Sequence, residues 1–448
     1  MPKDIIKEVL SLAKKDKVAF IDLQFTDFLG NIKSSTIPIY NLEGALTKGI
    51  WIDGSSIEGF ARIHESDMFL MPDPGTYALL PWRNHTEGGR VARLICDVYK
   101  PNHEPFEGDP RNILKRVLAE AKGLGYEYYT GPECEFFLFP KTPEGKIIRE
   151  SQGNGFYFNL IMDEPYIIKR EIMEALDAMG ITTETSTHEV AEKQHEIDIR
   201  YDKALRTADN TITLKMAAKF IAFKHNFHAT FMPKPFFGIN GSGMHTHQSL
   251  WKNGKNAFYD KSDKYGLSKL AYQFLTGQLT HVREIAGVFA PTVNSYKRLT
   301  PGYEAPVYAC WARINRSALI RVPNVSKGLE DKATRLEIRC PDPSSNPYLT
   351  FAVLLKAGIE GIKKNMKAPG PVEENLFEFD DEKLAKYYIN KLPASLNEAI
   401  AEIEKGKMVK EVFGEYTWRR YLEAKKAEWD DFRISVTDWE IDRYLATV

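Results

Sequence analysis

Cysteine is scarce in this chain, and net charge is almost absent. Four cysteines, at positions 96, 134, 310 and 340, occur among 448 residues. They form no Cys-x-x-Cys pair, so no disulfide framework is implied and a reduced, cytoplasmic protein is expected. A formal net charge of −1 gives no basic excess of the kind that indicates nucleic acid binding.

Long apolar runs are also missing. No stretch of about 18 apolar residues is present, so no membrane span is expected. The first ten residues carry mixed charge in an amphipathic pattern, which indicates a helix rather than a signal peptide. Internal repeats and low-complexity tracts are absent as well. What remains is a chain with 43% hydrophobic residues, long enough for two or three globular domains.

The most informative local pattern is the glycine-containing stretch at residues 240–249. Side chains alternate between the faces of an extended strand, so His245, His247 and Ser249 would project together. Two imidazoles and a hydroxyl on one face are typical of a metal or phosphate site, but they also occur as polar residues on a wet face. The choice between these interpretations depends on the other segments.

A second strand pattern covers residues 131–139 and places Glu133 and Glu135 on one face. The run that follows, at 136–139, is entirely apolar, which argues against a solvated sheet edge. Two carboxylates inside a buried strand repel each other and lose hydration. A bound cation is the simplest compensation.

Residues 334–340 alternate in the same way, with Arg335, Glu337 and Arg339 on one face. Alone, this pattern is typical of a surface strand with cross-strand ion pairs. Beside the other segments, it supplies a carboxylate for a metal and two guanidiniums for anions. Five arginines suited to fork-like binding of phosphate or carboxylate lie in this part of the chain: Arg298, Arg316, Arg321, Arg335 and Arg339.

Glu189 and Glu196 complete the acidic candidates. They are seven residues apart, which predicts a bend rather than one straight strand between them. The ligands are thus mostly carboxylates with one or two histidines, and hard oxygen ligands select Mg²⁺ or Mn²⁺ over zinc or copper. The carboxylates exceed what one ion needs, so two or three ions shared with a phosphate fit better. With the arginines, they indicate phosphoryl transfer.

At this point the motifs identify a family. The chain closely resembles type I glutamine synthetase over essentially all of its 448 residues. Several long motifs occur in the family's order, so coincidence is negligible. They lie at residues 53–56, 65–68, 131–136, 240–249, 294–299, 303–306, 315–317, 320–323 and 335–339.

The resemblance implies an α+β protein. A small N-terminal β-grasp domain would precede a large glutamine-synthetase-type catalytic α/β domain, in which an antiparallel sheet lines the active site. A segment with three prolines at residues 100–110 marks the change between them. We therefore place the domains at residues 1–104 and 105–448. Alternating patterns predict strands at 19–25 and 93–99.

Helices are expected at residues 111–124 and over most of 395–448. Ser395 and Glu398 have the spacing of a capping box at the start of the second region. The apolar side chains of this C-terminal region are expected to pack within the subunit or against a neighbour: Trp429, Phe432, Trp439, Ile441, Tyr444 and Leu445.

The resemblance also implies an activity and an assembly. The enzyme would ligate ammonia to the γ-carboxylate of L-glutamate through γ-glutamyl phosphate, using ATP and two or three Mg²⁺ or Mn²⁺ ions per site, in nitrogen assimilation. It would form a homo-dodecamer of two stacked hexameric rings. Active sites would lie between subunits, with the Asp53 loop supplied by the neighbour.

Residue matching assigns implied roles. One metal ion would be held by Glu135, Glu189 and Glu196, and a second by Glu133, His245 and Glu337. ATP would contact Glu184, His247, Ser249, Arg316, Arg321, Lys332 and Arg335. Glutamate and its phosphorylated form would contact Asn240, Gly241, Arg298, Glu304, Arg316 and Arg339.

Four of the matched residues would act in catalysis. Arg316 and Arg339 would neutralise the phosphoryl transition state. Asp53 and Glu304 would attract ammonium and take its proton, and Glu304 lies in a flap that would exclude water. Outside the family context, Asp53 next to Gly54 is more typical of a plain turn residue.

Other positions depart from the family or bear on regulation. Phe377 occupies the position at which longer members carry an adenylylated tyrosine, and phenylalanine lacks the hydroxyl that this modification needs. The chain therefore resembles the short subtype. Arg62 matches an arginine tied to glutamine feedback in some short members, although an ion pair with Glu58 or Glu65 explains it equally well. The loop at residues 324–331, before Lys332, is longer than usual.

Three alternatives remain open. A γ-glutamyl ligase for a polyamine or alkylamine would keep the metal and phosphate residues but lose the ammonium site. A catalytically inactive relative acting as a binding protein would have lost ligands. A guanidino kinase would lack the Asp53 loop and the Arg298 motif. The presence of all these residues favours the synthetase.

Overall fold

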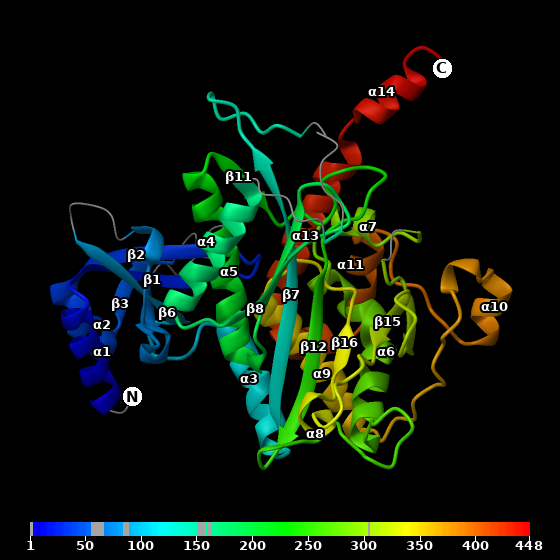
Figure 1. Ribbon diagram of the computed structural model, residues 1–448, viewed down its shortest axis with the longest axis horizontal. Coiled ribbons are helices and arrows are strands. Elements are labelled where there is room, and N and C mark those ends of the chain that lie inside the picture. The colour runs from blue at the N-terminus through cyan, green and yellow to red at the C-terminus, as the bar shows by residue number, and fades with distance from the viewer. Residues whose placement is uncertain (1–2, 55–66, 84–88, 150–156, 159–163, 303–304) are drawn as a thin grey trace.

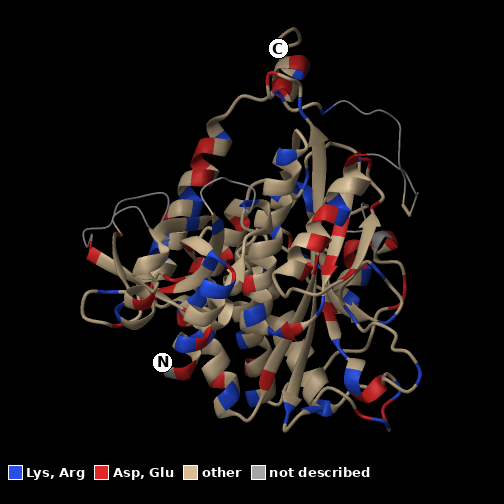
Figure 2. Cartoon of the chain, turned by 60° about the vertical axis from the view of Figure 1, so that its left-hand side comes forward, with Lys and Arg blue, Asp and Glu red and all other residues tan. Residues whose placement is uncertain are grey.

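The computed structural model describes residues 3–54, 67–83, 89–149, 157–158, 164–302 and 305–448. Figure 1 shows a small N-terminal part beside a larger body built around long strands. Acidic and basic residues are intermixed along both parts (Figure 2), in line with the near-zero net charge. No helix in the described ranges combines the length and apolarity needed to cross a bilayer.

The N-terminal part is a six-stranded sheet in the order β2-β1-β6-β4-β3, with β5 also paired to β6. Its strands are β1 (Val18–Thr26), β2 (Ile32–Pro38), β3 (Ile50–Asp53), β4 (Asp67–Pro72), β5 (Ala78–Leu79) and β6 (Arg90–Tyr99). Helices α1 (Lys3–Lys15) and α2 (Leu42–Lys48) bury Val9 and Leu46 against Leu23 and Leu94 of the sheet. The strands expected at 19–25 and 93–99 are confirmed.

The larger part contains a ten-stranded sheet in the order β14-β15-β16-β12-β7-β9-β8. These strands are β7 (Glu127–Pro140), β8 (Thr183–His188), β9 (Gln194–Ile199), β12 (Met244–Lys252), β14 (Tyr308–Ala312), β15 (Ala318–Arg321) and β16 (Leu336–Ile338). The short strands β10 (Asp202–Lys203) and β11 (Phe227–Thr230) pair with β7, and β13 (Lys255–Asn256) pairs with β12. All pairs are antiparallel except β14 with β15, as the fold class predicts.

Helices cover one face of this sheet. Alternation along the strands turns Phe136 and Ile197 into a core with α4 (Glu164–Ala178) and α5 (Ala204–Lys224), and turns Leu250 and Ile338 into a core with α6 (Lys269–Phe289) and α9 (Pro347–Lys363). The opposite face, which carries the odd-numbered residues of β7, β12 and β16, is left for the polar site.

The remaining helices are mostly short or C-terminal. They are α3 (Pro110–Gly123), α7 (Ser295–Arg298), α8 (Glu330–Ala333), α10 (Asp381–Lys386), α11 (Leu396–Lys405), α12 (Met408–Phe413), α13 (Glu415–Ile434) and α14 (Asp438–Tyr444), with 3-10 turns η1 (Ile39–Asn41), η2 (Pro74–Thr76), η3 (Pro81–Arg83) and η4 (Leu376–Glu378). The predicted helix at 111–124 and the helical C-terminal region are therefore present.

The predicted capping box at Ser395 is only half formed. The Ser395 hydroxyl accepts the Glu398 N–H, but the Glu398 carboxylate accepts the N–H of Ala394 instead of that of Ser395. Beyond it, the last helix extends away from the body (Figure 1), and Trp439 and Leu445 are exposed. Trp439 contacts Tyr444 of the same helix, and packing of these exposed side chains against a neighbour stays a prediction.

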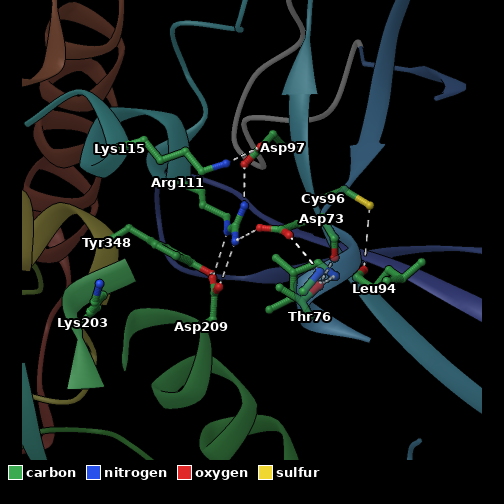
Figure 3. Close-up of polar contacts among 12 residues, drawn as sticks. Asp73, Thr76, Leu94, Cys96, Asp97, Arg111, Lys115, Lys203, Asp209 and Tyr348 are labelled. Atoms are coloured by element: carbon green, nitrogen blue, oxygen red, sulfur yellow. Dashed lines mark hydrogen bonds and ion pairs between the residues drawn. The ribbon is translucent and has the colours of Figure 1, made fainter. Parts of the chain in front are cut away.

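A buried ionic cluster joins the two parts of the chain (Figure 3). Arg111 of α3 donates to Asp97 of β6 and to Asp73, each at 2.8 Å. It also makes two bonds, of 3.0 and 2.9 Å, to Asp209 of α5, which accepts the Tyr348 hydroxyl at 2.6 Å. One guanidinium thus neutralises carboxylates from both sides of the proline-rich segment. The boundary near residue 105 itself stays a prediction.

Candidate active site

Glu133 is the centre of the polar face. It stands opposite His245 in the antiparallel pairing of β7 with β12. His245 Nδ1 lies 3.1 Å from one Glu133 oxygen, and His247 Nε2 lies 2.7 Å from the other. Burial raises the pKa of Glu133, but the two imidazoles outweigh this and hold the pKa well below its usual range.

The tautomer of His247 follows from its two partners. Its Nδ1 lies 3.1 Å from Arg335 Nε, and a guanidinium can only donate. Nδ1 must therefore accept, which leaves the ring proton on Nε2 to be donated to Glu133. The two hydrogen bonds therefore run in one direction, with Arg335 donating to His247 and His247 donating to Glu133.

Glu133, His245 and Glu337 could hold a cation together. One ligand atom from each lies within 4.8 Å of the others. Burial lowers the pKa of His245 to about 4, so its imidazole is neutral and able to coordinate. Glu337 is fully buried, and it accepts from Arg339 at 2.5 Å and from Arg321 at 2.6 Å. Two carboxylates and one neutral imidazole fit Mg²⁺ or Mn²⁺.

A second acidic group lies one residue pair further along the sheet. Glu135 of β7 is directly opposite Glu196 of β9. Burial, followed by the charge of Glu189, raises the pKa of Glu135 to about 8. Burial, followed by the charge of Glu135, raises the pKa of Glu196 to about 11. Carboxylates that resist ionisation to this extent fit a divalent cation, which would remove the repulsion.

The predicted bend between Glu189 and Glu196 is present. β8 ends at His188 and β9 begins at Gln194, and Lys193 adopts a φ of 65° in the turn between them. The turn brings Glu189 back toward the sheet, where its charge is felt by both Glu135 and Glu196.

A cavity of about 280 Å³ adjoins Glu133. Five of the seven residues predicted to contact ATP line it: Glu184, His247, Ser249, Lys332 and Arg335. The two others do not. Arg321 instead bonds Glu337, and Arg316 is exposed in the connection between β14 and β15, in hydrogen-bond contact with Tyr157.

The loop before β12 is held closely against its surroundings. A Cβ on Gly241 would lie 2.2 Å from the Pro233 carbonyl oxygen, so only glycine fits there. Ser242 N–H donates to the same Pro233 oxygen at 2.7 Å. Arg298 lies against this loop but donates to the carbonyl oxygens of Cys340 at 2.8 Å and Arg339 at 3.0 Å.

Asp53 is not part of this group. It ends β3 and is exposed, and β3 lies in the N-terminal part, on the far side of α5 from β12 in Figure 1. Glu304 and Arg62 lie outside the described residues.

Sequence reasoning missed two side chains on the polar face. Asp198 of β9 is opposite Glu133 and lines the cavity, and burial raises its pKa to about 6. Gln194 contacts Glu135 at 2.7 Å. The alternation that identified Glu133 and Glu135 would also have placed Gln194, Glu196 and Asp198 on one face.

Comparison with known proteins matches both parts of the chain to one family. Residues 17–101 match the β-grasp domain of glutamine synthetase, and residues 107–444 match its catalytic domain. Glutamine synthetase of Clostridium saccharobutylicum is 50% identical over 446 residues, covering 99% of each chain. That of Thermotoga maritima is 49% identical over 98% of this chain and 99% of the other.

Solved structures are similar over the same length. The glutamine synthetase of Plasmodium falciparum superposes with a TM-score of 0.86 at 26% identity, covering 98% of each chain. A GmaS/ADP complex gives a TM-score of 0.86 at 31% identity, over 98% of this chain and 99% of the other. With both domains matched in order and close relatives aligned from end to end, this chain belongs to the glutamine synthetase family.

Proposed function

We propose that this protein is an ATP-dependent enzyme that ligates ammonia to the γ-carboxylate of L-glutamate and forms L-glutamine through γ-glutamyl phosphate. One observation carries the proposal. The cavity that would take ATP shares Glu133 with the set Glu133–His245–Glu337, and Arg339 donates to Glu337 of the same set. A phosphoryl group passing from this cavity toward that set would have Arg335 in the cavity wall and Arg339 at Glu337 near its path.

The two-step route follows from the chemistry of carboxylates. A carboxylate is a poor acyl donor, whereas phosphate is a good leaving group, so phosphorylation prepares glutamate for attack by ammonia. Arg339 and Arg316 would neutralise the transferring phosphoryl group. Arg335, Lys332 and Ser249 would hold the nucleotide, and the oriented His247 would keep Arg335 in line with Glu133.

Divalent cations belong to this proposal. The sets Glu133–His245–Glu337 and Glu135–Glu189–Glu196 would hold at least two Mg²⁺ or Mn²⁺ ions. When bound, such ions supply positive charge to the phosphates. The supporting observation is the raised pKa of Glu135 and Glu196, because their repulsion has no sufficient compensation among the described side chains.

Ammonium capture would require a second subunit. Strand β3, which ends at Asp53, lies on the far side of α5 from β12 (Figure 1), so Asp53 would act with Glu304 in the site of a neighbour. We therefore propose the homo-dodecamer of two hexameric rings, supported also by the exposed apolar side chains of α14. Native mass measurement would test the size of the assembly.

Phosphate release from ATP and Mg²⁺ with glutamate tests the activity. We expect release that requires both glutamate and ammonium, with one glutamine formed per phosphate. Turnover only with putrescine or methylamine would move the assignment to a γ-glutamyl-amine ligase. A folded, assembled enzyme inactive with every amine would favour a binding protein.

A further inference from the structure

Gln194, the first residue of β9, lies between three parts of the site. Its side chain is 1% exposed. Its amide nitrogen donates to Glu135 Oε2 at 2.7 Å and to the Gly241 carbonyl oxygen at 3.2 Å. The two hydrogens of one amide group therefore join a candidate metal ligand on β7 to the loop that precedes β12.

The rest of Gln194 holds the turn that carries Glu189. Its Oε1 accepts the Ala191 N–H at 3.4 Å. Its backbone N–H donates to the Ala191 carbonyl at 3.0 Å, and its own carbonyl accepts the Glu189 N–H at 2.9 Å. One residue thus links the backbone beside Glu189 with the side chain of Glu135.

These contacts fix the orientation of the Glu135 carboxylate and of the 241–242 peptide as well as their positions. Glu135 Oε2 also accepts the Gly243 N–H at 3.0 Å, so two donors on one oxygen set the plane of the carboxylate. On the loop, Gln194 holds the carbonyl of the planar 241–242 peptide while Pro233 accepts its N–H at 2.7 Å. The peptide is therefore held from opposite sides.

We propose that Gln194 is a positioning residue, which holds the Glu135 carboxylate and the 240–243 loop in one arrangement so that a divalent cation and the amino-acid substrate bind in register. The inference rests on the proposed function, in which Asn240 and Gly241 contact glutamate. Removing the outer hydrogen-bond partner of a metal ligand typically lowers metal affinity by about 10–100-fold.

Gln194→Met tests the proposal, because it keeps the length and volume of the side chain but removes both donors. The matched control is Gln273→Met on α6, where a glutamine that is 6% exposed donates to Asn365 at 3.1 Å, far along the chain from the site. Mn²⁺ binding is measured calorimetrically on the assembled enzyme without nucleotide or glutamate. KM is then measured for glutamate and for ATP separately.

For Gln194→Met we expect Mn²⁺ affinity to fall about tenfold or more and the KM for glutamate to rise by a similar factor, with the KM for ATP unchanged. Gln273→Met should keep all three wild-type values. A purely structural role would move the melting temperature and weaken all constants alike.

Wild-type Mn²⁺ affinity and wild-type KM for glutamate in folded Gln194→Met would overturn the proposal. If that variant does not fold, Gln194→Asn, which keeps the amide but cannot span the same distances, takes its place. Failure of both to assemble would assign Gln194 to fold stability instead. Failure of the proposed function is distinct, because wild-type enzyme would then form no glutamine while the Mn²⁺ comparison could still be made.

Discussion

Two buried groups of carboxylates in this molecule are neutralised in different ways. In the cluster between the N-terminal and catalytic parts, Asp73, Asp97 and Asp209 surround Arg111, which donates to all of them (Figure 3). On the catalytic sheet, Glu135 and Glu196 face each other, and their pKa values rise to about 8 and about 11.

The difference suggests a test for telling a structural cluster from a binding one. The first group carries its own cation as part of the fold, so its charges are compensated as soon as the chain folds. In the second group protonation relieves the repulsion, and under the proposed function a bound cation would do so in its place. The following experiments test whether this distinction is real.

Removing Arg111 should have the largest effect on stability. Arg111→Met leaves three carboxylates without their shared partner, and breaking a buried ion pair in this way typically costs about 3–5 kcal/mol. We expect a large fall in the free energy of unfolding, measured by denaturant titration at fixed enzyme concentration. A change below about 1 kcal/mol would show that the cluster is not a structural one.

Neutralising Glu196 should affect metal binding and activity without the loss of stability expected for Arg111→Met. The raised pKa keeps this side chain protonated in the folded, metal-free protein, whereas the unfolded chain ionises it above its ordinary pKa of 4.5. Glutamine carries no such cost, so Glu196→Gln should raise metal-free stability at neutral pH. The stabilisation by Mn²⁺ should be lost and activity should fall by about a hundredfold or more. Glu127→Gln, at the exposed start of the same sheet's β7, serves as the control; an unchanged Mn²⁺ response in Glu196→Gln would remove the basis for a metal there.

Stability should depend on pH through Asp109, which caps α3. Burial, followed by the charge of Asp97, raises the pKa of Asp109 to about 7. The folded state then holds a proton that the unfolded state releases near pH 4, so stability falls as pH rises from about 4 to 7 and levels off above, at up to about 1.4 kcal/mol per pH unit.

The control for this slope is Asp109→Asn, measured in Mn²⁺-saturated enzyme so that Glu135 and Glu196 do not contribute. The variant should show a flatter slope than the wild type over that range. Equal slopes would mean that Asp109 is ionised throughout.

The smallest effect is expected at an exposed ion pair. Arg170 and Glu174 lie 3.6 Å apart on α4 with 64% and 69% of their side chains exposed. Arg170→Met should therefore change the free energy of unfolding by less than about 1 kcal/mol. A loss comparable to that of Arg111→Met would show that counting charges, rather than burial, sets the stability of this protein.

Local alternation explains what was predictable from sequence. It placed Glu133 beside Glu135, grouped His245 with His247, and required the bend before Glu196. These are consequences of the period of a strand, which any short segment reveals. The order of the motifs added the family and the fold class.

Long-range contacts explain the rest. The Gln194 amide donates to residues 59 and 47 positions away in the sequence. No local sequence pattern predicts these two contacts. The commitment of Arg298 to the Cys340 carbonyl, and the reach of Arg111 to Asp209, likewise depend on how distant elements pack. Motifs singled out candidate residues for the site, but no motif pointed to the side chains that hold those candidates in place.

Strand β7 should tolerate no insertion or deletion during the evolution of this enzyme. It pairs with β9, β10, β11 and β12, and it carries Tyr129 in the cavity wall as well as Glu133 and Glu135. A single inserted residue would send every side chain beyond it to the opposite face. Length variation among relatives should therefore accumulate in the loops, while the 14 residues of β7 keep Tyr129 of the cavity wall at a constant spacing from Glu133 and Glu135.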